Sequence, residues 1–186
     1  MIRRSPKFTF SRRRPGFTLI EAAITTVIIG VGCVAMLELL AAGTIANKEG
    51  TELTTAINLA GNVREAMSGL YYTDPTSPTH WGAETGETSP ALYDDLDDFD
   101  GWTSSPGNPI DARRAPLGSD YSTWAQKVKV DSINPANLTA TASHLTLPPE
   151  QRPTCRITVT ITHNGKTIYT QNWIAAYADP SAPTGP

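Results

Sequence analysis

The chain has 186 residues, 39% of them hydrophobic and 18% charged, a length that accommodates one ordinary domain with extensions but excludes a large multidomain enzyme. Its two cysteines are too few to crosslink a small secreted scaffold. The net charge of −3 conceals an asymmetry, because six of the fifteen basic residues lie in the first fourteen positions, with no acidic residue among them. From Pro15 onward there are nine basic residues against eighteen acidic ones. This body should repel phosphate backbones, so we expect no nucleic-acid partner.

The basic segment leads directly into an apolar stretch, residues 17–46, whose only charges are Glu21 and Glu38. The sixteen residues between these two glutamates would span about 24 Å as a helix, and the flanking apolar residues extend this to the thickness of a membrane core, about 30 Å. Positive charge before an apolar segment predicts a cytoplasmic N-terminus and an exported body. We therefore expect a single-pass membrane anchor with an extracytoplasmic domain.

Glu21 is unusual in such a segment. A carboxylate inside a membrane helix costs about 2.5–3.5 kcal/mol on insertion scales and is a functional candidate. No Lys, Arg or His lies between Arg14 and Lys48 to neutralise it. Cleavage after Gly16 would create a positively charged amino group on Phe17, about one helical turn from Glu21. That amine could pair with Glu21 of the same helix or of a neighbouring helix.

The residues around Gly16 also carry a family resemblance. The run from Arg12 to Glu21, Arg-Arg-Arg-Pro-Gly-Phe-Thr-Leu-Ile-Glu, resembles the class III signal of type IV pilins and type II secretion pseudopilins. That signal combines a short basic leader, a Gly, an apolar first mature residue and a Glu four positions later. The resemblance covers residues 12–40. It implies cleavage between Gly16 and Phe17 by a prepilin peptidase, which also methylates the new amino group.

The resemblance further implies a structural filament subunit that assembles through a helix over residues 17–70. Its expected partners are other pilin or pseudopilin subunits, the prepilin peptidase, an inner-membrane assembly platform and the membrane. Its expected location is the bacterial inner membrane, with the N-terminus cytoplasmic, followed by an extracytoplasmic filament. The expected organisation is a leader at 1–16, a membrane and assembly half-helix at 17–42, an amphipathic half-helix at 43–70, an extracytoplasmic domain at 71–178 and a loose tail at 179–186.

Other interpretations of the N-terminus remain open. An ordinary signal peptide could end at residues 41–43, Ala-Ala-Gly, and a lipoprotein signal would need Cys33, although the residues before it fit a lipobox poorly. A plain anchor would explain the hydrophobicity alone. None of these accounts for Glu21 placed after Gly16 and Phe17. The rival function is a monomeric, membrane-anchored extracytoplasmic binding module.

The helical pattern continues beyond the apolar stretch. Apolar residues recur at spacings of three or four and form one stripe: Leu53, Ile57, Ala60, Val63, Met67 and Leu70. No proline interrupts residues 17–73, so the pattern predicts a single helix of about fifty residues whose second half packs on the body. Gly30 and Gly32 are the points where this helix could kink.

Residues 74–120 are rich in proline and contain five aspartates in seven positions: Asp94, Asp95, Asp97, Asp98 and Asp100. A calcium loop is one interpretation, but Leu96 stands where an EF-hand needs a ligand. We favour a turn whose aspartates cap backbone amides while the interspersed Tyr93, Leu96, Phe99 and Trp102 pack inward. The run also resembles one in mannose-sensitive-haemagglutinin-type minor pilins, which favours a minor subunit.

The C-terminal third has the alternation of a sheet, with strands expected over residues 124–130, 156–162 and 167–177. Asn164-Gly165 between the last two predicts a tight hairpin. The expected fold is therefore α+β, a long N-terminal helix packed on an antiparallel sheet of about three strands. The sequence lacks a Gly-rich phosphate loop, H-E-x-x-H and G-x-S-x-G, so we expect neither an enzyme nor a cofactor, with calcium as the remaining ligand candidate.

Overall fold

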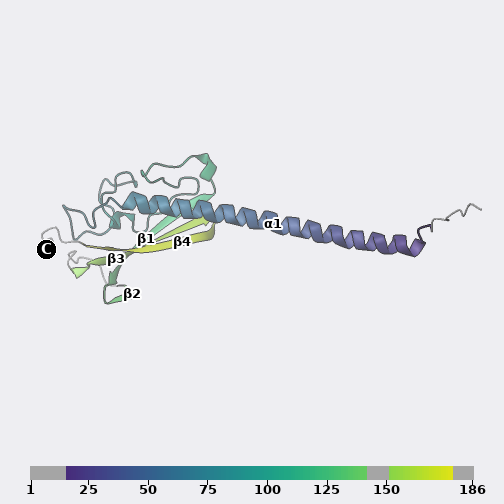
Figure 1. Ribbon diagram of the computed structural model, residues 1–186. Coiled ribbons are helices and arrows are strands. Elements are labelled where there is room, and N and C mark those ends of the chain that lie inside the picture. The colour runs from purple at the N-terminus through teal and green to yellow at the C-terminus, as the bar shows by residue number, and fades with distance from the viewer. Residues whose placement is uncertain (1–15, 142–150, 178–186) are drawn as a thin grey trace, which may run out of the picture. The chain divides into compact units, whose positions relative to one another are not determined.

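The structure of the chain, a computed structural model, describes residues 16–141 and 151–177 (Figure 1). The expected leader, apart from Gly16, and the expected tail lie outside these residues. The described elements are α1 (Leu19–Met67), the short 3-10 helices η1 (Asp97–Phe99) and η2 (Ser119–Tyr121), and strands β1 (Trp124–Asn134), β2 (Asn137–Thr141), β3 (Thr154–His163) and β4 (Lys166–Ala176). The chain divides into two compact units, with the boundary between Lys48 and Glu49 inside α1.

Helix α1 is a single element of 49 residues that continues through Gly30 and Gly32, as the absence of proline predicts. It begins where the Thr18 hydroxyl accepts a hydrogen bond from the Glu21 amide at 3.3 Å, the bond of an N-cap. It ends at Met67, so Leu70 lies beyond the helix, although its side chain still packs against the core.

The buried face of α1 differs from the predicted stripe. Leu53 and Ile57 are 44% and 45% exposed, so the prediction was wrong at these two positions. The residues that α1 buries are Ala56, Leu59, Ala60, Val63, Ala66 and Met67. Three of the six are alanines, whose small side chains let a helix approach its neighbour closely. The predicted stripe shares Ala60, Val63 and Met67 with this face but missed Ala56, Leu59 and Ala66, so the buried face is displaced around the helix from the predicted one.

The sheet is antiparallel throughout, with the strand order β2-β1-β3-β4. Its three longer strands confirm the predicted ones, although β1 continues past Val130 to Asn134. The fourth strand, β2, was not predicted. It has five residues, Asn-Leu-Thr-Ala-Thr, and pairs with the end of β1 at the edge of the sheet. A short strand with one large apolar residue has no alternating apolar pattern, so pairing with β1 rather than its own sequence determines that this segment is a strand.

The hairpin between β3 and β4 forms at the predicted place. Asn164 and Gly165 have positive φ angles of 51° and 77°, and the flanking residues His163 and Lys166 pair across the strands. Two consecutive positive φ angles are what a two-residue type I′ turn requires.

The second half of α1 runs beside the sheet (Figure 1), and residues of both belong to one hydrophobic core. Alternate residues of β1 and β3, including Val128, Val159 and Ile161, are fully buried, while Lys127 and Lys129 on the other face of β1 are exposed. The connection between α1 and β1 adds Phe99 to the same core. The expected α+β fold, a helix packed on an antiparallel sheet, is confirmed.

Candidate functional site

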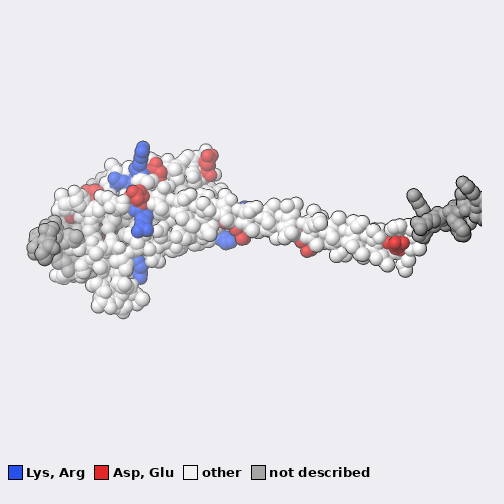
Figure 2. Space-filling model, viewed as in Figure 1, with Lys and Arg blue, Asp and Glu red and all other residues white. Residues whose placement is uncertain are grey.

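The first half of α1 presents an apolar surface that the described residues leave uncovered. Every large hydrophobic side chain from Phe17 to Ile45 is more than half exposed, and Figure 2 shows few charges along this part of the helix. Its most apolar 18-residue window has a mean hydropathy of 2.2, and none of it is buried. By length and composition this helix could cross a membrane, a property that signal sequences share.

The three residues of the predicted processing and assembly motif lie at the start of α1. Gly16 and Phe17 precede the helix, so the peptide bond between them is outside regular structure, and Phe17 is 72% exposed. Glu21 lies in the first helical turn, where a carboxylate interacts favourably with the helix dipole. Among the described residues, Glu21 forms no ion pair. The structure thus places Glu21 at a helix start, and its pairing with an amine stays a prediction.

The aspartate run forms a tight turn around η1. Asp95 Oδ1 accepts hydrogen bonds from the amides of Asp97 and Asp98 at 2.9 and 3.2 Å. Asp98 Oδ2 accepts in return from the amides of Asp94 and Asp95 at 3.0 and 3.1 Å. These reciprocal bonds satisfy amides that a single 3-10 turn leaves without partners. They have the form that the capping interpretation predicts.

Two other aspartates tie this turn to neighbouring segments. Asp97 Oδ2 accepts from the Gly82 amide at 3.0 Å. Asp100 accepts from the Trp81 indole through one oxygen and from the Val130 amide of β1 through the other, both at 3.0 Å. The interspersed Tyr93, Leu96 and Phe99 are buried in the core and Trp102 packs against it, again as the capping interpretation predicts.

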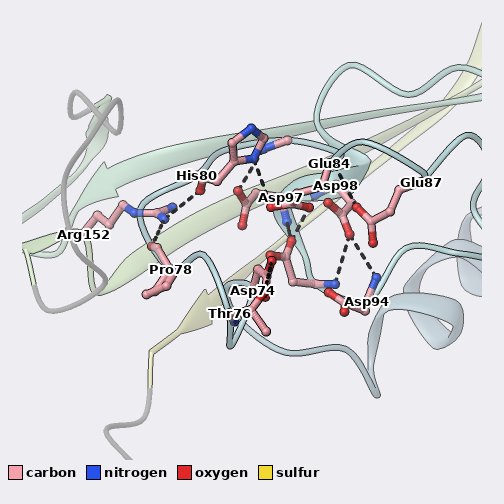
Figure 3. A network of polar contacts seen from close by, with 12 residues as sticks. Asp74, Thr76, Pro78, His80, Glu84, Glu87, Asp94, Asp97, Asp98 and Arg152 are labelled. Carbon is pink, nitrogen blue, oxygen red and sulfur yellow. Dashed lines mark hydrogen bonds and ion pairs between the residues drawn. The ribbon is translucent and has the colours of Figure 1, made fainter.

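The structure brings two further carboxylates to the run, Glu84 and Glu87, which the sequence analysis did not single out. They face each other across a turn in which the Glu84 amide donates to Glu87 Oε2 at 2.9 Å. One carboxylate oxygen from each of Glu84, Glu87 and Asp98 lies within 4.8 Å of the other two (Figure 3). The carboxylates of Asp94, Asp95 and Asp98 form a second such group. The Glu-x-x-Glu pattern was visible in the sequence, but nothing there connects it to residues more than ten positions later.

Burial raises the pKa values of Asp98, Glu84 and Asp95. The pKa of Asp98 rises to about 6, mainly through burial and further through the charge of Glu87, while its two backbone hydrogen bonds oppose the rise. The pKa of Glu84 rises to about 8 through burial and its contact with Glu87. The pKa of Asp95 rises to about 9 through burial and the charge of Asp97. The cluster therefore favours a bound proton or cation over an array of bare charges.

A buried arginine lies at one side of the cluster. Arg152 is 1% exposed and donates from Nη2 to the carbonyl oxygens of Pro78 and His80 at 2.8 and 3.3 Å (Figure 3). Its guanidinium lies 4.9 Å from the centroid of the Trp81 ring, and its charge partly offsets the rise in the pKa of Asp97. Arg152 thus attaches the loop of residues 78–81 to the segment before β3. The imidazole of His80 contacts Glu84 Oε1 at 3.0 Å.

A shallow hollow of about 460 Å³ lies elsewhere on the body, with Trp102, Ser104 and Arg114 among its lining residues. Its polar side chains are partly engaged already, because Arg114 donates to the carbonyl oxygens of Pro90 and Tyr93, and the Ser104 hydroxyl accepts from the Gln126 amide. The hollow offers little distinctive chemistry for ligand recognition.

Comparison with known proteins found no protein-family model, no curated protein and no solved structure that matches this chain. Its architecture, an apolar N-terminal helix followed by a C-terminal antiparallel sheet against which the second half of that helix packs, is pilin-like.

Proposed function

We propose that this chain is a structural subunit, of the minor class, of a type IV pilus or a type II secretion pseudopilus. The observation that carries the proposal is the exposed apolar surface of α1 between Phe17 and Ile45. A surface of this size is covered by lipid or by protein, and a filament core made of parallel helices provides the second once the subunit leaves the membrane. The motif of Gly16, Phe17 and Glu21 directly before this surface supports the same assignment.

In this proposal the helix has two successive environments. The subunit waits in the bacterial inner membrane as a single-pass protein after the prepilin peptidase has removed residues 1–16. An assembly platform then transfers it into the filament, where the apolar surface of α1 packs against other subunits. Both environments bury the same side chains, so the transfer exchanges lipid contacts for protein contacts.

Glu21 specifies the register of this packing. The Phe17 amine of an incoming subunit pairs with Glu21 of a neighbour in a low-dielectric core. A buried ion pair adds little net stability, but removing one partner costs about 3–5 kcal/mol because it leaves the other charge unpaired. The pair therefore penalises misaligned helices more than it stabilises aligned ones.

Analysis of the mature N-terminus tests the processing step. Mass spectrometry and N-terminal sequencing of the protein from its native membrane should find a chain that begins with methylated Phe17. A chain that begins at Met1, or near Thr44, would contradict the filament assignment. A start at Met1 would favour the monomeric anchored module, and a start near Thr44 would favour an ordinary signal peptide.

The substitution Glu21→Ala tests the assembly step. Cleavage and membrane insertion should persist, and incorporation into filaments should fall by more than about tenfold because the Phe17 amine loses its partner. Glu38→Ala is the matched control, since it removes the other carboxylate of the apolar segment, and it should incorporate normally. Co-purification of Glu21→Ala with filaments at the unsubstituted level would instead mean that Glu21 is protonated or reaches the lipid headgroups.

A further inference from the structure

The cluster of carboxylates around Asp98 lies on the body of the chain, remote in sequence from the assembly motif. Hydrogen bonds account for the positions of most aspartate side chains in the turn. They leave one oxygen of Asp98 without a donor, and they do not account for the convergence of Glu84 and Glu87 on the Asp98 side chain.

Asp98 is 3% exposed, and its two oxygens have different surroundings. Oδ2 accepts the amides of Asp94 and Asp95, whereas Oδ1 is fully buried and accepts no hydrogen bond from any residue that the structure describes. A buried carboxylate oxygen without a donor is costly, and most such groups in proteins have a partner. When ionised, the half-buried carboxylates of Glu84 and Glu87 are acceptors as well, so the missing partner is either a proton held within the cluster or a bound cation.

The spacing of these oxygens fits a particular kind of partner. The three carboxylates place one oxygen each within 4.8 Å of the others. Calcium binds oxygen ligands at about 2.3–2.6 Å, so two ligands on opposite sides of one ion lie up to about 5 Å apart. Magnesium demands near-ideal octahedral geometry and gives up its water reluctantly, so it is the weaker candidate for a cage of converging carboxylates. Because Glu84 and Glu87 are only half-buried, an ion can reach the cluster from solvent.

We propose that Glu84, Glu87 and Asp98 bind a calcium ion, with the more exposed Asp94 as a further ligand at the rim. Water completes the coordination shell, which for calcium holds six to eight oxygens. The ion gives Asp98 Oδ1 its partner and neutralises the repulsion among the carboxylates. It also joins the turn of residues 84–87 to η1, two segments of the connection between α1 and β1.

A calcium titration of the full chain in detergent micelles tests this proposal. The protein is stripped with a chelator at pH 8, and thermal unfolding is followed by tryptophan fluorescence while calcium chloride is added. For a dissociation constant of about 0.1 mM, typical of extracellular modules, about 10 mM calcium should raise Tm by about 5–10 °C. Magnesium chloride at the same concentration should give a smaller rise. Absence of a calcium-dependent rise in Tm would overturn the proposal.

Matched variants locate the ion. Glu87→Gln should abolish the calcium-dependent rise, while its stability without calcium should equal or exceed that of the unsubstituted chain because one repelling charge is gone. Glu65→Gln, an exposed position on α1, is the control and should retain the full rise. If Glu87→Gln and Glu84→Gln both respond to calcium as the unsubstituted chain does, the ion binds elsewhere and the proposed site is wrong.

Discussion

Gln126 connects α1 to the body of the chain, and its substitution gives a quantitative test of that connection. The side chain is 0% exposed on β1. Its Nε2 donates to the carbonyl oxygens of Leu59 in α1 and of Ile110 in the loops, both at 3.0 Å. Its Oε1 accepts from the Ile110 amide at 2.7 Å. Gln126→Met keeps a similar volume and removes all three hydrogen bonds.

The expected loss of unfolding free energy depends on which polar groups the substitution leaves without a hydrogen-bond partner. The Leu59 carbonyl lies inside α1 and keeps its helical hydrogen bond. Losing the bond from Gln126 to this carbonyl therefore costs only the ordinary net value of a hydrogen bond, about 0.5–1.5 kcal/mol. The amide and carbonyl of Ile110, a residue that is 3% exposed, lose partners in a buried position, at about 1–3 kcal/mol for each group. Relaxation of the loop recovers part of this, so Gln126→Met should lose about 3–5 kcal/mol, or about 6–20 °C in Tm.

Thermal and urea unfolding of the full chain in detergent, followed by tryptophan fluorescence, would measure this loss. Gln171→Met on the half-buried β4 is the matched control and should change the free energy of unfolding by less than about 1 kcal/mol. A loss below about 1 kcal/mol for Gln126→Met would refute the reasoning. It would mean that apolar packing alone holds α1 on the sheet.

Three further predictions concern processing, the hairpin and pH. Gly16→Val should leave an uncleaved, membrane-bound precursor, visible as a larger band on a gel, because a side chain at the cleavage site obstructs the peptidase; normal processing would contradict the cleavage assignment. Gly165→Val places a β-branched residue at a φ of 77° and should cost at least about 1–2 kcal/mol in urea unfolding, and an unchanged midpoint would argue against the type I′ turn. Because the folded-state pKa values of Asp98, Glu84 and Asp95 are raised to about 6, 8 and 9, these acids bind more protons folded than unfolded. Their stabilising contribution is therefore complete below about pH 4 and is lost as the pH rises through those values. The Tm measured in chelator should fall from pH 6 to pH 9, and a rise over that range would contradict the raised pKa values.

Local patterns in the sequence were sufficient for the elements whose determinants are local. The uninterrupted helix followed from the lack of proline between residues 17 and 73, and the hairpin followed from Asn164-Gly165, since only a few residue types tolerate two positive φ angles. The alternation in β1 and β3 likewise predicted which residues face the core. In each case the conformational preference belongs to the segment itself.

Tertiary structure decided what depends on contacts between distant segments. Which side of α1 is buried depended on the packing of residues such as Ala56 and Ala60 in the core shared with the sheet, and β2 depended on pairing with the end of β1. The convergence of Glu84 and Glu87 on Asp98 depended on how a proline-rich connection folds back on itself. Such a connection has no repeating pattern of apolar residues from which spatial neighbours can be inferred. Which of its residues lie close together is therefore decided by packing and hydrogen bonding across the whole body rather than by sequence spacing.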